Sequence, residues 1–191
     1  MRIVAILGLA AVLGGAAAVS SAHGEPGAAE PLALLRGERA SDLLPARFRL
    51  PSMAVVDSRL VASRRSEGRP VRLYLVQTAN GSLCSLLVYR GSAAGMGCDL
   101  PSGFFGDEGG LAAISGRFFA GIVANEVSQL VIIGRQGDRH PVGFTADRGF
   151  IVGCRGPDGC ACSVAWAETY DAAGVRISRD RWLAPRCWRR D

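Results

Sequence analysis

Short segments of alternating apolar and polar residues, separated by turn residues, constrain the fold of this chain most. From Val71 to Leu75 every second residue is apolar, which is typical of a strand with one buried face. Asn80-Gly81 follows, the dipeptide most typical of a tight β-hairpin. The return segment Leu83–Tyr89 is apolar on both faces, so we expect it to lie inside a sheet or between layers.

The same pattern continues toward the C-terminus, and no amphipathic helix interrupts it. We predict further strands at residues 117–123, 127–133, 141–145, 150–154, 160–170 and 175–178. Turn segments containing Gly and Asp separate them, at 135–138, 146–149, 156–159 and 171–174. Strands this short and closely spaced predict an all-β fold, either an antiparallel sandwich or a barrel-like sheet. A twisted sheet with a helix on one face is the alternative.

Helical material is confined to a short N-terminal segment. Pro31 precedes Leu32–Leu35 and Gly37 follows, the usual arrangement of a short helix. We predict that the charged segment Arg64–Arg69 is an exposed connector and that the Gly-rich segment Gly91–Gly97 is a flexible return between two cysteines.

The first 22 residues are typical of a secretory signal peptide. Arg2 precedes the apolar run Ile3–Val19, and Ser20-Ser21-Ala22 supplies a small-residue cleavage site. An uncut membrane anchor is the alternative, although the run is near the lower limit of length for crossing a bilayer. We therefore expect a signal peptide (1–22), a flexible lead-in with the short helix (23–44) and a single β-rich domain with an Arg-rich C-terminal tail (45–191). The mature protein would be secreted or held at the cell envelope, with no transmembrane segment.

Export would place the cysteines in an oxidising compartment, where disulfides form and persist. There are six, namely Cys84, Cys98, Cys154, Cys160, Cys162 and Cys187. Cys84 and Cys98 are the local pair. Cys160 and Cys162 project from the same face of a predicted strand, so each needs a different partner. We favour Cys154–Cys160 and Cys162–Cys187, and the swapped pairing is the alternative.

A metal site built from the last four cysteines is the competing hypothesis. Structural zinc sites usually contain a C-x(2–4)-C knuckle, which Cys160-Ala161-Cys162 does not supply. A C-x-x-C redox motif is also missing from the sequence. The sequence therefore predicts disulfides, with no metal and no cofactor.

The basic residues provide one candidate binding surface. All 22 are arginine, in a chain rich in Ala and Gly with a formal net charge of +5. This usage is typical of coding bias in a high-GC genome, so nucleic acid is disfavoured as a partner. Near the C-terminus, however, arginines interleave with tryptophans, and guanidinium groups beside aromatic rings can contact an anionic envelope polymer. The candidate contacts are Arg176, Arg179, Arg181, Trp182, Trp188, Arg189 and Arg190. The alternative is an arginine-rich edge strand and tail, with Trp182 covering the core.

Catalytic residues are not assigned by the sequence. His140 lies at the entry to a predicted strand, after a turn, and is the one histidine far from the signal cleavage site. Asp107-Glu108 is a carboxylate pair in the loop Gly103–Gly110, which we expect to be solvated. Phe104-Phe105 in this loop either insert into the core or form a contact patch. The sequence contains no nucleophile elbow, phosphate-binding loop or calcium loop.

Three segments carry a resemblance to known proteins. They are RLYLVQTANGSLCSLLVY with the Gly-rich return to Cys98, SGRFFAGIVANEVSQLVII and GFTADRGFIVGC. In a Leu-Cys strand and a Gly-x-Val-x-x-x-Val strand pair, here Gly121, Val123 and Val127, the chain resembles a loose group of small exported proteins of high-GC Gram-positive bacteria, mostly uncharacterised. The resemblance covers roughly Pro45–Ser178, and it implies an exported β-rich domain without implying an activity.

Three functional hypotheses follow. The first is a binding or structural role at the envelope or outside the cell, with an anionic polymer or another exported protein as the partner. The second is an envelope hydrolase that uses His140 or a carboxylate pair. The third is a subunit that joins a larger exported assembly by adding an edge strand, which would require an uncovered apolar edge.

Overall fold

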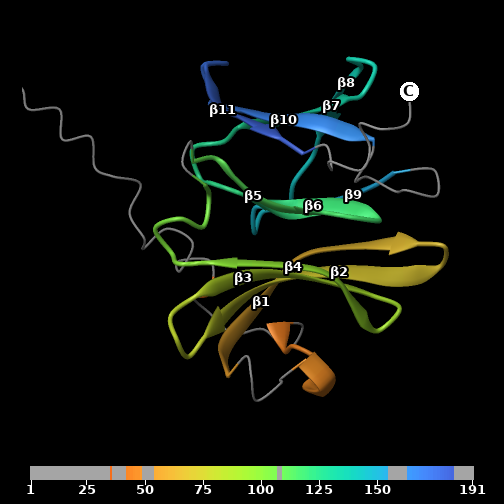
Figure 1. Ribbon diagram of the computed structural model, residues 1–191, viewed down its shortest axis with the longest axis vertical. Coiled ribbons are helices and arrows are strands. Elements are labelled where there is room, and N and C mark those ends of the chain that lie inside the picture. The colour runs from red at the N-terminus through yellow and green to blue at the C-terminus, as the bar shows by residue number, and fades with distance from the viewer. Residues whose placement is uncertain (1–34, 36–41, 49–53, 107–108, 155–162, 183–191) are drawn as a thin grey trace, which may run out of the picture.

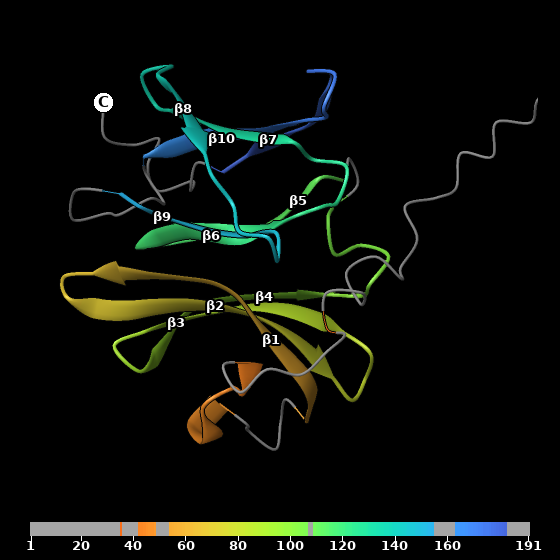
Figure 2. The same ribbon diagram turned by 180° about the vertical axis from the view of Figure 1, so that it is seen from behind.

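Antiparallel strands make up almost all of the structure, a computed structural model that describes residues 35, 42–48, 54–106, 109–154 and 163–182. The strands form three sheets that stack as layers (Figure 1 and Figure 2). The fold is therefore the all-β antiparallel class that the sequence predicts, in the form of a layered sandwich.

The lower sheet in Figure 1 is a meander in which each strand pairs with the next one along the chain. It consists of β1 (Val55–Ser66), β2 (Arg69–Thr78), β3 (Leu83–Tyr89) and β4 (Ser92–Asp99). The middle sheet has the order β5-β6-β9, with β5 (Leu111–Ser115), β6 (Phe118–Val123) and β9 (Gly149–Gly153). The upper sheet has the order β11-β10-β7-β8, with β7 (Gln129–Gly134), β8 (Arg139–Val142), β10 (Val164–Tyr170) and β11 (Arg176–Arg181).

The core consists of the apolar layers on the two sides of the middle sheet. Every residue of β6 is buried, because alternate side chains of this strand face opposite neighbours. Phe118 and Ile122 pack toward the lower sheet, whereas Phe119 and Val123 pack toward the upper one. Strand β6 therefore reads as a continuous apolar run rather than an alternating one, as expected for a strand covered on both faces.

The prediction for Leu83–Tyr89 is confirmed, because this segment is β3, an internal strand that is buried along its whole length. One of its faces packs toward the middle sheet, and the other toward a short N-terminal segment that includes Leu44 and Phe48. That segment contains a 3₁₀ turn, Ala46–Phe48. A short N-terminal helix is not confirmed: its predicted residues, apart from Leu35, lie outside the described part of the chain.

Two segments that the sequence assigns to connections are strands in the structure. The segment Arg64–Arg69 is exposed, but it forms the end of β1, a tight turn at Glu67-Gly68 and the start of β2. The backbone of both turn residues has positive φ (51° and 70°), which suits a two-residue hairpin turn. Backbone pairing with β2 thus outweighs the charged composition.

The segment Gly91–Gly97 lies mostly in β4, which pairs with β3 along its length. Its small residues have a packing function rather than a flexible one. A Cβ atom on Gly95 would lie 3.0 Å from Ile114 of β5, and one on Gly97 would lie 3.2 Å from the same side chain. The glycines therefore allow β4 to cross close to the middle sheet.

The local disulfide is confirmed, and it joins Cys84 of β3 to Cys98 of β4. Cys154, at the end of β9, is also disulfide-bonded. The pairings predicted for Cys160, Cys162 and Cys187 lie outside the described residues. Within the described ranges, no helix is both long and apolar enough to cross a membrane.

Candidate functional site

The outward face of the upper sheet gathers charged and aromatic side chains. In β10 the even-numbered residues Trp166, Glu168 and Tyr170 share this face, whereas Ala167 packs in the core. The strand register aligns β11 with them, because Glu168 pairs with Arg179. Two strands that are separated by a tight turn therefore present one continuous polar surface.

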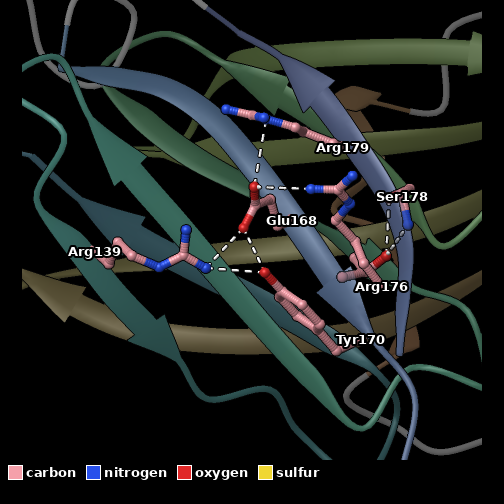
Figure 3. A network of polar contacts seen from close by, with 7 residues as sticks. Arg139, Glu168, Tyr170, Arg176, Ser178 and Arg179 are labelled. Carbon is pink, nitrogen blue, oxygen red and sulfur yellow. Dashed lines mark hydrogen bonds and ion pairs between the residues drawn. The ribbon is translucent and has the colours of Figure 1, made fainter. Parts of the chain in front are cut away.

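Glu168 is the centre of this surface, and Figure 3 shows the side chains that converge on it. Its carboxylate accepts hydrogen bonds from Arg139 of β8 (2.7 Å) and from the Tyr170 hydroxyl (2.5 Å). The other carboxylate oxygen forms ion pairs with Arg179 at 3.3 Å and with Arg176 at 3.7 Å. The Glu168 side chain is only 3% exposed, so the arginines and the tyrosine cover it almost completely.

The environment of Glu168 keeps the carboxylate charged. Desolvation by burial raises the pKa of Glu168. Hydrogen bonds from Tyr170 and Arg139 and the charges of Arg139 and Arg179 lower it, and together they outweigh the desolvation. The net effect is a pKa below the ordinary value of glutamate. The hydrogen bonds that Arg139 donates to Glu168 and to the Tyr170 hydroxyl oxygen raise the pKa of Arg139.

The indole ring of Trp166 contacts two guanidinium groups, that of Arg179 and that of one further arginine, Arg181. Arg179 lies over the ring at 4.5 Å from its centroid, and Arg181 lies at 5.6 Å. Cation–π contacts of this kind favour an extended arginine lying flat against the ring. The aromatic ring and the carboxylate thus hold Arg179 from two sides.

We call Arg139, Arg176, Arg179 and Arg181, grouped around Glu168 and Trp166, the arginine face. Among the residues that the structure describes, this face gathers four guanidinium groups around one carboxylate, an excess of positive charge. The side chains of Arg139, Arg176 and Arg179 are 45–51% exposed, so they are accessible to a ligand. The chemistry of such a surface is the recognition of carboxylate or phosphate groups.

The structure brings together Arg176, Arg179 and Arg181, three of the residues predicted as polymer contacts. It places Trp182 elsewhere, half-buried, with its ring 5.3 Å from the ring of Phe119, where it covers the core. Trp188, Arg189 and Arg190 lie outside the described residues.

Sequence reasoning missed Arg139, Trp166, Glu168 and Tyr170. One signal was present, since the segment Trp166–Tyr170 alternates large polar and small residues within a predicted strand. The contribution of Arg139 carries no such signal, because β8 and β10 lie on opposite sides of β7.

His140 lies on the other face of the upper sheet, at a cavity of about 460 Å³. Its Nε2 atom is hydrogen-bonded to the Asp138 carboxylate. The hydrogen bond from His140 and a backbone hydrogen bond lower the pKa of Asp138. Ser163 also lines this cavity, but among the described residues His140 is bonded to Asp138 alone. Among the described residues, a base and its orienting carboxylate are present, and no nucleophile is hydrogen-bonded to them.

The remaining candidates contribute little to a site. Phe104 is buried and Phe105 packs against the core, so this pair inserts into the core. Asp107 and Glu108 lie outside the described residues. Over the part of the chain that the structure describes, no three His, Cys, Asp or Glu side chains group as a metal site requires.

Comparisons with protein families, with curated proteins and with solved structures found no match to this chain. Its function is therefore inferred from the chemistry of its surfaces.

Proposed function

We propose that this chain is an exported binding protein whose arginine face contacts an anionic polymer of the cell envelope. The excess of positive charge on this face is the observation that supports it. The three guanidinium groups that contact Glu168 carry roughly fifteen N–H donors, whereas one carboxylate offers about four acceptor sites. Glu168 and Trp166 fix the directions of the arginines, and the donor capacity of the cluster exceeds what Glu168 can accept.

The arrangement of the arginines favours polymer binding over a role limited to protecting the edges of the sheet. Arginines on an edge strand also discourage unwanted strand pairing, and β11 is such a strand. Protection of the two edges, however, does not require their arginines to meet, whereas Arg139 of β8 and Arg176 and Arg179 of β11 converge on one carboxylate, that of Glu168. Arg139 extends the positive surface across the whole sheet, as a polymer with repeated charges requires.

The test compares two triple variants with the same change in net charge. One replaces Arg176, Arg179 and Arg181 by Gln, and the control replaces three exposed arginines of the β1–β2 hairpin, Arg65, Arg69 and Arg72. Binding to inorganic polyphosphate and to polyglutamate is measured by fluorescence anisotropy at 50 mM and 200 mM salt.

We expect the first variant to lose at least tenfold in affinity and to show a weaker salt dependence, whereas the control loses less than threefold. Equal losses in both variants would mean that diffuse charge, not the arginine face, attracts the polymer. No binding of either polymer by the unmodified protein at 50 mM salt would contradict the proposed function. The two polymers distinguish phosphate from carboxylate as the preferred group.

The exposed edge of β4 supports a second candidate function, that of a subunit that assembles by strand addition. The Cα atoms of Cys84 and Cys98 are 4.0 Å apart, the short spacing of a non-hydrogen-bonded pair. The backbone N–H and C=O groups of Cys98, and of Met96 two residues before it, therefore point away from β3. From Ser92 to Cys98 the strand has neither charge nor proline to protect it, and Met96 is 51% exposed.

A second copy of the chain fits this edge. Antiparallel pairing about Met96 would place the two methionine side chains together and keep Asp99, the acidic residue of the strand, at opposite ends. Sedimentation velocity tests this with Met96→Lys and with Val56→Lys, a more exposed apolar position on β1, the other edge of the sheet. We expect a dimer that Met96→Lys dissociates and Val56→Lys does not. A monomer at 100 µM would exclude self-pairing.

A further inference from the structure

The cavity beside His140 is a second site, independent of the arginine face. It opens between β8 and β9, the edge strands of the upper and middle sheets. Much of its wall is apolar and comes from Ile132, Val142, Val152 and Val164. Its volume of about 460 Å³ lies within the range of small-molecule pockets.

The direction of side chains along β8 explains why the two sites differ. His140 pairs with Ile132 of β7, so both side chains lie on the inner face of the sheet and line the cavity. Arg139 lies on the opposite face, where it reaches Glu168. Successive residues of one short strand therefore serve opposite surfaces.

A glycine permits the contact between Asp138 and His140. A Cβ atom on Gly134 would overlap the Asp138 carboxylate, so any other residue at that position would displace it. The turn holds its geometry through hydrogen bonds from the Gly134 N–H to the Asp138 carbonyl (2.8 Å) and from the Gly137 N–H to the Gly134 carbonyl (3.0 Å). The Asp138 carboxylate is thus held at the cavity by its backbone as well as by His140.

The polar groups of the cavity select for a ligand that donates hydrogen bonds. A carboxylate is only an acceptor, so in its contact with Asp138 the Nε2 atom of His140 carries the proton. In the neutral ring, Nδ1 is then an acceptor as well. None of the described residues that line the cavity is an arginine, in a chain where all 22 basic residues are arginine. The described lining of the cavity therefore combines an apolar body, one carboxylate and hydrogen-bond acceptors.

We propose that this cavity binds small primary amines that carry an apolar body, with the ammonium group directed at Asp138 and His140. The apolar part would contact Ile132, Val142 and Val164. An ammonium group supplies three donors and one positive charge, which complement the acceptors and the carboxylate. A carboxylate ligand of the same size would meet repulsion from Asp138. The chemistry of this site is opposite to that of the arginine face.

The experiment is a calorimetric titration of the folded protein at pH 8, where histidine is ordinarily neutral. The probes are 2-phenylethylamine, 2-phenylethanol and 3-phenylpropionate, which share a ring and differ in the charge of the head group. The variants are Asp138→Asn and Val142→Trp, which fills the cavity. Glu126→Gln is the control, because it removes the same charge at an exposed position away from the cavity.

We expect 2-phenylethylamine to bind at least tenfold more tightly than 3-phenylpropionate, with the alcohol between them. Asp138→Asn should weaken amine binding at least tenfold and remove the preference for the amine over the alcohol, whereas Glu126→Gln should change the affinity for the amine less than twofold. Val142→Trp should abolish binding of the amine and of the alcohol, and an unchanged thermal unfolding curve would confirm that this variant folds. An unchanged affinity in Asp138→Asn, a preference for the acid, or no amine binding at 10 mM would each overturn the proposal. None of these outcomes depends on whether the arginine face binds a polymer.

Discussion

Replacement of Glu168 by glutamine separates stability from anion binding, because the two should change in opposite directions. The variant keeps the shape of the side chain and removes the one negative charge among the four arginines of the face. The structure loses charge-assisted hydrogen bonds from Arg139 and Tyr170 and the attraction to Arg176 and Arg179. The arginines are then left to repel one another.

The size of the stability loss follows from the exposure of the partners. Removing one member of a fully buried ion pair costs about 3–5 kcal/mol. Glu168 is 3% exposed, but its three arginine partners are 45–51% exposed and can regain water, which screens the loss. We therefore expect the free energy of unfolding to fall by about 2 kcal/mol. In a protein of this size, that corresponds to a decrease in Tm of about 4–8 °C.

The loss should depend on pH. The folded-state pKa of Glu168 lies below its ordinary value, so the folded state favours the charged form. The stabilisation is therefore fully present above the unfolded pKa of about 4.3 and is lost as pH falls through the folded value. The difference in Tm between the native protein and Glu168→Gln should be largest near pH 7 and should shrink below about pH 4.

Differential scanning calorimetry at pH 7 and pH 3 measures the stability, and anisotropy with polyphosphate measures the affinity. We expect Glu168→Gln to lower Tm at pH 7 and to bind polyphosphate at least as tightly as the native protein, since the positive excess rises by one charge. An equal Tm at pH 7, or the same difference at both pH values, would refute the role given to the carboxylate. A loss of affinity in a variant that remains folded would show that the arrangement of the arginines, not their charge, governs binding.

Two further predictions concern the fold. Replacing Cys84 and Cys98 by serine opens a loop with a sequence separation of 14, and it should lower the free energy of unfolding by about 3 kcal/mol in a denaturant titration. A decrease below about 0.5 kcal/mol would contradict the chain-entropy argument. Gly121→Ala should cost about 3 kcal/mol or more in the same assay, because the new Cβ would collide with the Ala112 carbonyl oxygen. Gly143→Ala, where the Cβ meets nothing within 4 Å, is its control and should change the stability by less than about 0.5 kcal/mol; equal losses would exclude crowding as the cause.

The sequence predicts the strands whose composition matches their place in the fold. The segment Leu83–Tyr89 coincides with β3, because an apolar run on both faces has no stable position except between two layers. The long strand β1 was missed, and so was β5. In β1, charged residues obscure the pattern because the end of the hairpin extends beyond the core into solvent.

The Gly-rich strand β4 could not be predicted from residue preferences. Glycine weakens a strand through its backbone entropy, so the segment resembles a loop by composition. The structure stabilises it by tertiary contacts instead: the disulfide from Cys84 to Cys98 and the close packing of Gly95 and Gly97 under Ile114. None of these contacts leaves a periodic signal in the sequence.

The candidate site was predictable to the extent that it is local. Arg179 and Arg181 alternate along one strand, so the sequence alone places these two on one face, whereas Arg176 joins them through an irregularity in the β10–β11 register. Arg139 is 29 residues from Glu168, and its place depends on the sheet order, in which β7 lies between β8 and β10. Sheet order cannot be derived from local patterns when each strand is short and the turns are similar.

Strand β8 shows how one short element can serve two surfaces of opposite charge. Its residues alternate across the sheet, so Arg139 adds a cation to the outer face while His140 joins Asp138 at the inner cavity. A shift of register by one residue would place the histidine beside Glu168 and the guanidinium in the cavity. The arginine face would then lose the guanidinium of Arg139, and the cavity would lose the imidazole of His140. The turn before β8 prevents such a shift, because Gly134 is hydrogen-bonded to Asp138 and leaves no room for another side chain. The geometry of this turn therefore determines the chemistry of both candidate sites.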